Sequence, residues 1–245
     1  MTARTIGSRP PMSRRKLLQG ISLAGLALPL GGLLASCASD PKEQVSTLQP
    51  PPKEPGEALE RLKEGNKRFV TTATHTGQDE ARRVEVAKGQ KPFAAILSCV
   101  DSRVPPEVVF DQGLGDLFTA RVAAGIANDD SIGSIEFGVE EFKIPLVVVM
   151  GHQRCGAVVA TVEAVEAKAT SAPGEIGKLV AAIKPAVDAT AGKPGDHIDN
   201  AVRETTRQAV ALLLKSPILS EKIAAKELLV VGACYSLDSG AVEFL

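Results

Sequence analysis

Four short runs dominated by apolar residues constrain this chain most, because each has strand length and lies between segments with helical spacing. The runs are 93–97, 117–122, 146–150 and 228–233. Strands that are apolar along their whole length must be covered on both faces, which is typical of parallel sheets. The pattern predicts an α/β fold, with a mainly parallel sheet flanked by helices. Helices are expected at 57–70, 80–88, 130–142, 156–167, 175–189, 196–214 and 218–225.

The first 36 residues have the layout of an export signal. A basic stretch ends in Arg14-Arg15-Lys16, an apolar run follows over 17–35, and Leu-Ala-Ser precedes Cys37. This order predicts that residues 1–36 are a signal peptide. An uncleaved transmembrane anchor is the alternative, because the run is just long enough to span, although its glycines and Pro29 weaken it as a span.

Two local sequences make the predicted export route more specific. Residues 13–18 (Ser-Arg-Arg-Lys-Leu-Leu) resemble a twin-arginine signal. Residues 34–37 (Leu-Ala-Ser-Cys) resemble the lipobox of bacterial lipoproteins, which predicts that Cys37 becomes the acylated first residue of the mature chain. The protein is then expected to be attached to a bacterial membrane, in the periplasm or at the cell surface.

Composition separates a tether from a folded domain. Residues 37–55 include five prolines, so we expect a stiff, extended tether there and one folded domain over 56–245.

Removing the five basic residues that precede Cys37 from the total of 28 leaves 23 basic against 29 acidic residues. An acidic domain in a chain with only 3% aromatic residues lacks the basic and stacking surfaces that nucleic acids require.

Two polar clusters directly follow predicted strands. Ser98–Arg103 comes after the first run, and Gly151–Gly156 comes after the third. Because the carboxyl ends of parallel strands meet at one edge of a sheet, we expect Cys99, His152 and Cys155 to converge there. Two thiolates and an imidazole suit zinc, and three protein ligands leave the fourth tetrahedral position open, as in catalytic sites. We therefore predict one zinc ion per chain.

Asp101 and Arg103 add a charged pair beside the first predicted ligand. A neighbouring guanidinium keeps a carboxylate ionised and fixes its orientation. Asp101 could then accept a hydrogen bond from water at the open position, where zinc lowers the pKa of water toward neutrality. Taken alone, each cluster could be structural: a turn with a surface ion pair, or a buried histidine beside a core cysteine. Their joint occurrence after strands favours a metal site.

Together the two clusters resemble the β-class carbonic anhydrases. The family pattern Cys-x-Asp-x-Arg, followed further along by His-x-x-Cys, stands here unaltered, and the similarity extends from about Glu57 to Leu245. The resemblance implies that family's fold and the reversible hydration of carbon dioxide to bicarbonate. It also implies the roles of five residues, namely zinc ligation by Cys99, His152 and Cys155 and catalysis by the pair Asp101 and Arg103.

The resemblance assigns three substrate-pocket residues as well. Gln90, nine residues before Cys99, matches a glutamine that hydrogen-bonds substrate. Phe118 and Phe137 fall where the family lines its carbon dioxide pocket with aromatic rings, with core packing as the alternative. The family forms dimers with active sites at the subunit interface, so a homodimer or larger homo-oligomer is implied. Residues 121–125 read Arg-Val-Ala-Ala-Gly, whereas many relatives have Arg-Val-Ala-Gly-Asn.

Three other functions fit part of the pattern. A hydrolase of carbon disulfide or carbonyl sulfide would use the same zinc site. A thiol-redox protein would pair Cys99 with Cys155, but this gives no role to His152. A non-catalytic binding protein could hold zinc for structure, but it would have no need of the Asp101–Arg103 pair.

Overall fold

The computed structural model describes residues 50–72, 76–169 and 172–245, all within one compact unit. The expected signal peptide, Cys37 and the tether up to residue 49 lie outside the described residues. Within the described part of the chain, no helix is both long and apolar enough to cross a membrane. Pro55, expected as the last residue of the tether, is instead the first residue of helix α1 (Pro55–Thr72).

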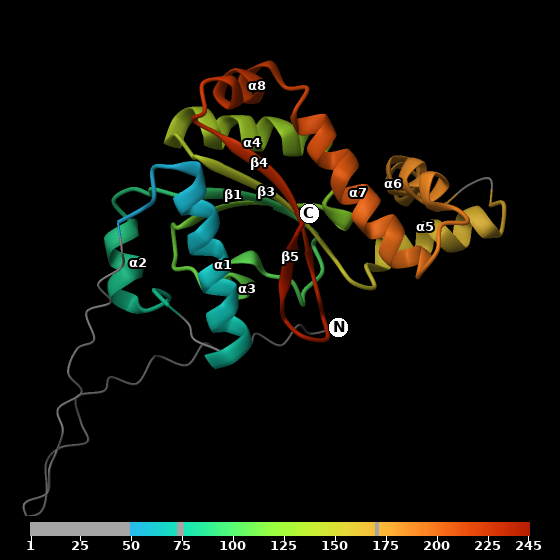
Figure 1. Ribbon diagram of the computed structural model, residues 1–245, viewed down its shortest axis with the longest axis horizontal. Helices are drawn as coiled ribbons and strands as arrows, with labels where there is room; N and C mark the ends of the chain where they lie inside the picture. Colours follow the sequence, from blue (N-terminus) through green and yellow to red (C-terminus); the bar gives the residue numbers. More distant parts are fainter. Residues whose placement is uncertain (1–49, 73–75, 170–171) are drawn as a thin grey trace, which may run out of the picture. The chain divides into compact units, whose positions relative to one another are not determined.

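The four predicted strands form, together with a short fifth strand, one sheet in the order β2-β1-β3-β4-β5 (Figure 1). The first four strands are parallel to their neighbours, and β5 is antiparallel to β4. The expected α/β fold with a mainly parallel sheet is therefore confirmed. The strand bounds are β1 (Ala94–Ser98), β2 (Leu117–Arg121), β3 (Leu146–His152), β4 (Leu229–Tyr235) and β5 (Val242–Phe244).

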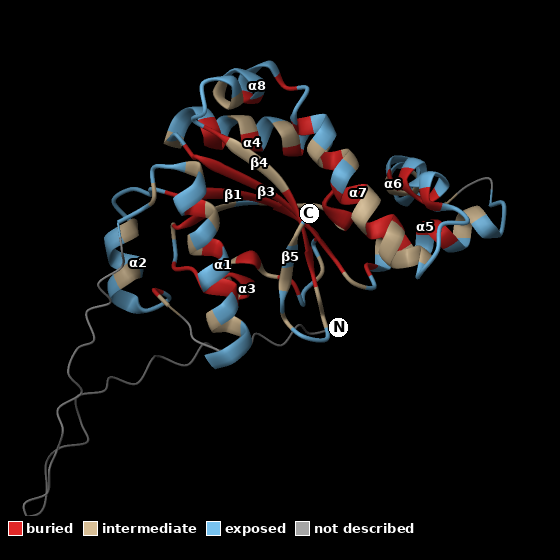
Figure 2. Ribbon diagram, viewed as in Figure 1, coloured by how far each residue is buried: buried red, intermediate tan, exposed pale blue. Residues whose placement is uncertain are grey.

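The central strands are buried on both sides (Figure 2), which explains their continuous apolar sequence. In β1, Ala94 and Ile96 pack into one apolar core, while Ala95 and Leu97 pack into the other. The first core also takes buried side chains from α1, α3, α5, α6 and the first half of α7. The second takes them from α4, α8 and the second half of α7.

The predicted helices all form, with small shifts at their ends. Several starts are fixed by side chains that satisfy free backbone N–H groups. Asn128 and Ser131 form a capping box at the start of α4, and the side-chain oxygens of Asp196 and Ser216 cap α7 and α8. The remaining helices are α2 (Glu80–Val86), α4 (Asp129–Phe142), α5 (Gly156–Glu166), α6 (Ile176–Thr190), α7 (His197–Leu213) and α8 (Pro217–Ala224).

Three short elements were not predicted from the sequence: α3 (Pro106–Val109), the 3-10 turn η1 (Ala123–Gly125) and strand β5. Each has only three or four residues, which is too few for a periodic pattern to be recognised. Two of them bear on the site, because η1 contributes a backbone N–H to it and β5 closes the hairpin that supports one of its loops.

Candidate metal centre

The three predicted ligands converge at the carboxyl edge of the sheet. Cys99 follows β1 directly, His152 is the last residue of β3, and Cys155 immediately precedes α5. Because β1 and β3 are adjacent, with Ser98 paired to Met150, the two loops leave the sheet side by side. All three side chains are buried, and their ligand atoms lie within 4.8 Å of one another.

The histidine is oriented for a ligand. Its Nδ1 lies 2.9 Å from the Gln153 carbonyl oxygen, which can only accept, so Nδ1 carries the proton and donates it. Nε2 is the nitrogen left for a ligand, and this atom is buried with no hydrogen-bond partner among the described residues. A histidine held by a backbone carbonyl through one nitrogen, with the other aimed at two thiols, is the arrangement found at zinc ligands.

The sulfur atoms are held as a donor pair. Cys99 Sγ accepts hydrogen bonds from the backbone N–H groups of Asp101 (3.4 Å) and Ala124 (3.3 Å) and lies 3.9 Å from Cys155 Sγ. Hydrogen bonding from Cys155, with further donors including these amides, lowers the pKa of the Cys99 thiol to about 4. The pKa of Cys155 is raised, because it donates to Cys99 and is buried. One thiolate is thus already favoured, and the donor set as a whole fits zinc.

Asp101 and Arg103 form the predicted pair over this ligand set. Asp101 Oδ1 accepts from the Arg103 backbone N–H (2.9 Å) and Nε (2.9 Å), and Oδ2 accepts from Nη2 (2.7 Å). The Arg103 hydrogen bonds hold the pKa of the Asp101 carboxyl well below its usual range. Asp101 Oδ2 also lies 3.9 Å from His152 Nε2. The pair is therefore ionised, fixed in orientation and close to the metal-binding atoms.

A residue whose role was not predicted holds the first loop in place. Arg121, the last residue of β2, donates from Nε to the Cys99 carbonyl oxygen (2.9 Å) and from Nη2 to the Asp101 carbonyl oxygen (2.6 Å). The available signal was positional, since Arg121 ends the strand that is paired with β1 and is in register with Ser98. Its guanidinium fixes the backbone that carries both Cys99, a predicted ligand, and the Asp101 carboxylate.

The second loop is held by the hairpin between β4 and β5. The Gln153 N–H donates to the Tyr235 carbonyl oxygen (3.0 Å), and the Ser236 hydroxyl donates to Gln153 Oε1 (3.1 Å). Arg154 forms a two-pronged ion pair with Asp238, at 2.9 and 2.7 Å. Both side chains of that pair are more than half exposed. These contacts were not predicted, because they join residues more than eighty positions apart.

The three predicted pocket residues do not reach the ligands within one chain. Gln90 is exposed and precedes β1, so the length of that strand separates it from Cys99. Phe118, on the edge strand β2, pairs with Ala95 and packs against Phe137 of α4, with ring centroids 6.3 Å apart. Phe137 is 58% exposed. Within one chain, Gln90 and Phe137 are therefore exposed, and Phe118 is partly buried against the second core.

Comparison with known proteins gives a consistent result. The family model described as carbonic anhydrase matches residues 94–242. Carbonic anhydrase 2 of Mycobacterium tuberculosis is 39% identical over 188 residues, covering 76% of this chain and 90% of the relative. A carbonic anhydrase of Mycolicibacterium smegmatis is 35% identical over 195 residues, covering 79% and 94%.

Solved structures show the same fold. A β-carbonic anhydrase of Coccomyxa, in complex with acetazolamide, matches with a TM-score of 0.59 at 24% identity, covering 76% of this chain and 86% of that one. One of two tetrameric β-carbonic anhydrases of Sordaria macrospora matches with a TM-score of 0.58 at 20% identity, covering 78% and 94%.

Proposed function

This chain belongs to the carbonic anhydrase family, and we propose that it converts carbon dioxide and water reversibly into bicarbonate and a proton. The observation that carries the proposal is the convergence of Cys99, His152 and Cys155 beneath a fixed, ionised Asp101. A binding protein that used zinc only for structure would not need this carboxylate.

Zinc held by Cys99, His152 and Cys155 would supply a Lewis acid that makes water a nucleophile near neutral pH. The chain's own contribution is orientation. Arg103 donates hydrogen bonds to both Asp101 oxygens. It leaves one lone pair free on Oδ2, the oxygen nearest His152. Through that lone pair, Asp101 accepts a hydrogen bond from the attacking water and directs the water toward carbon dioxide.

Metal analysis and a stopped-flow hydration assay on the same preparation test this function. We expect about one zinc per chain and rapid hydration of carbon dioxide that is lost when a chelator removes the metal and regained when zinc is returned. Carbon disulfide and carbonyl sulfide, assayed at equal enzyme concentration, are the control substrates. Faster turnover of either sulfur compound than of carbon dioxide would replace this proposal with the hydrolase.

The exposed pocket residues support a second part of the proposal, namely that the enzyme is a homodimer or larger homo-oligomer. Phe118, Phe137 and Phe142 form an aromatic cluster beside the open edge of β2, with ring centroids 5.7 to 6.3 Å apart. Phe118 and Phe142 are partly buried against the second core, whereas Phe137 is exposed. A partly exposed aromatic cluster next to an unpaired strand is typical of an interface. A second copy packed there would bring Gln90 and the phenylalanines toward a partner's metal centre. Light scattering on Phe137→Glu tests this, and an unchanged mass would contradict it.

The third part of the proposal is export in the folded state, followed by lipid attachment at Cys37. The support is chemical: Cys99 and Cys155 must be reduced to bind zinc, and an oxidising compartment would favour a disulfide before the site assembled. Replacing Arg14 and Arg15 by lysine should leave active enzyme in the cytoplasm. Replacing Cys37 by alanine should prevent acylation and leave activity unchanged. Normal export of the double-lysine variant would refute the twin-arginine route and leave the zinc site untouched.

A further inference from the structure

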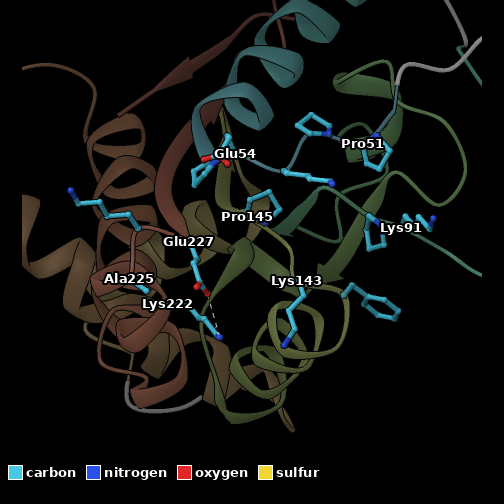
Figure 3. A pocket seen from close by; sticks show the side chains of 14 residues that line it. Pro51, Glu54, Lys91, Lys143, Pro145, Lys222, Ala225 and Glu227 are labelled. Atoms are coloured by element: carbon cyan, nitrogen blue, oxygen red, sulfur yellow. Dashed lines mark ion pairs between the residues drawn. The ribbon is translucent and has the colours of Figure 1, made fainter.

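A hollow of about 940 Å³ lies at the amino edge of the sheet, opposite to the metal centre (Figure 3). It is formed by residues 51–55 and by the segments that precede β1, β3 and β4. We call it the lysine hollow, because its lining includes Lys53, Lys91, Lys143, Lys222 and Lys226. Since β1, β3 and β4 are five to seven residues long, roughly 16–23 Å of strand separates it from the zinc ligands.

The charge of the lysine hollow is positive and largely uncompensated. Its lining contains two acidic residues, Glu54 and Glu227. Glu227 pairs with Lys222 at 3.4 Å, whereas none of the other four lysines has a carboxylate partner among the described residues. The domain as a whole is acidic, so this surface is a local exception. Charges further away than about 10 Å are screened, so an anion at the hollow would respond mainly to these lysines.

The walls of the lysine hollow are mostly apolar. Below the ammonium groups lie proline rings, one aromatic ring and a methyl group, contributed by Pro51, Pro52, Pro55, Pro92, Phe142, Pro145 and Ala225. Lysine side chains reach across such surfaces with their methylene stems while keeping the charge in water. A cationic rim over apolar walls is complementary to an anionic headgroup that carries apolar chains.

The described chain begins at this hollow. Residues 51–55 form part of its lining, and Pro50 stands thirteen positions after Cys37. An extended segment of that length reaches about 45 Å, so acylation of Cys37 would keep the hollow near a bilayer. On the other side of residues 50–54, a second hollow is lined by four glutamates, Glu54, Glu57, Glu60 and Glu64, and by two basic residues, Lys53 and Arg61. Its acidic residues outnumber its basic ones, so an anionic surface would favour the lysine hollow over this one.

We propose that the lysine hollow binds the anionic headgroups of a phospholipid bilayer, so that the domain rests on the membrane by its amino edge. The inference rests on the proposed lipid attachment at Cys37, which would keep the domain near a bilayer. It rests also on the lysines, which would bind the anionic headgroups.

The test uses residues 38–245, which lack both the signal and the acylation site but keep both apolar cores. We expect this protein to bind phosphatidylglycerol-containing vesicles and not vesicles of phosphatidylcholine alone. Changing Lys53, Lys91, Lys143 and Lys226 to glutamine should weaken binding roughly a hundredfold. The control variant changes the exposed residues Lys67, Lys168, Lys193 and Lys215 instead, which removes the same charge. Lys168 has a positive φ, as Lys143 and Lys226 do, so the control also covers substitution at such positions.

Four outcomes would overturn the proposal: equal binding to neutral vesicles, equal losses in the two lysine variants, an altered oligomeric state of the hollow variant, or stabilisation by inorganic phosphate without vesicle binding. The third would identify an interface between copies, and the fourth a soluble anion. Incorporation of labelled palmitate into the full chain is measured separately. If no label is incorporated but vesicle binding is intact, only the acylation of Cys37 is refuted. The lysine hollow then remains as the membrane contact.

Discussion

The two loops that supply the ligands are held in different ways and carry different chemistry. The first loop, residues 99–103, brings one ligand together with the reactive carboxylate, and the part-buried Arg121 fixes its backbone. The second loop, residues 152–155, brings two ligands and no reacting group, and the β4–β5 hairpin supports it from the surface. This difference leads us to expect that metal binding and turnover are separable: both loops would be needed to hold zinc, whereas only the first would position the water.

The largest expected effect is one in which the two loops behave alike. Cys99→Ser and Cys155→Ser should each lose zinc and activity together, because a hydroxyl is a poor substitute for a thiolate ligand. We expect each loss to exceed the roughly 100-fold cost of removing an outer partner of a metal ligand. Zinc content and hydration rate are measured on the same samples, with Cys234→Ser as control, since Cys234 is a buried free cysteine outside the site. Full activity in a metal-free Cys99→Ser protein would remove zinc from the mechanism.

The next effect should separate the loops. Asp101→Asn should retain zinc and lose about 10²- to 10⁴-fold in turnover, because the amide cannot act as the anionic acceptor for the attacking water. Asp238→Asn is the matched change at the second loop, where the carboxylate touches only Arg154 at the surface. Its turnover should stay close to that of the wild type. Equal rates in the two variants would mean that the carboxylate of the first loop has no special role.

Arg103→Gln should have a smaller effect that depends on pH. Arg103 holds the pKa of Asp101 below its ordinary value, so the carboxylate of the wild type stays ionised as the pH falls through about 4. Without Arg103 that pKa rises, and Asp101 is protonated at a higher pH. We therefore expect roughly a tenfold loss near neutral pH, from poorer orientation, and a larger loss toward acid. A pH–rate profile that is lowered evenly at every pH would argue against the electrostatic part of this explanation.

Much of this arrangement could be predicted from the sequence, and the rest could not, for identifiable reasons. The continuous apolar strands indicated a parallel sheet, and the carboxyl edge of a parallel sheet is where Cys99, His152 and Cys155 had to meet. Asp101 and Arg103 are two residues apart, so their pairing was local. The supports of the loops are not local: Arg121 reaches back from a neighbouring strand, and Asp238 comes from a hairpin whose second strand has only three residues.

The pocket residues show a different limit of prediction from one sequence. Gln90, Phe118 and Phe137 were assigned by resemblance, and within one chain they lie on the surface away from the ligands. Periodicity in a single sequence does not distinguish an aromatic side chain that packs in the core of its own chain from one that packs at an interface with a second copy. The exposed β2 edge beside the aromatic cluster makes that distinction, and it is a property of the folded chain.

The smallest expected effects compare the two supports directly, with the same substitution in each. Arg121→Gln breaks two charge-assisted hydrogen bonds to the part-buried backbone of the first loop, and we expect zinc loss to a chelator to become about tenfold faster. Arg154→Gln breaks an exposed ion pair, which solvent screens, so the change should be less than about threefold. Chelator-induced release, followed with a zinc-sensitive dye, reports the difference without relying on activity. Equally fast release from Arg154→Gln and Arg121→Gln would show that the exposed ion pair supports the second loop as much as Arg121 supports the first. The backbone hydrogen bond from Gln153 to the hairpin would then be insufficient to hold the second loop.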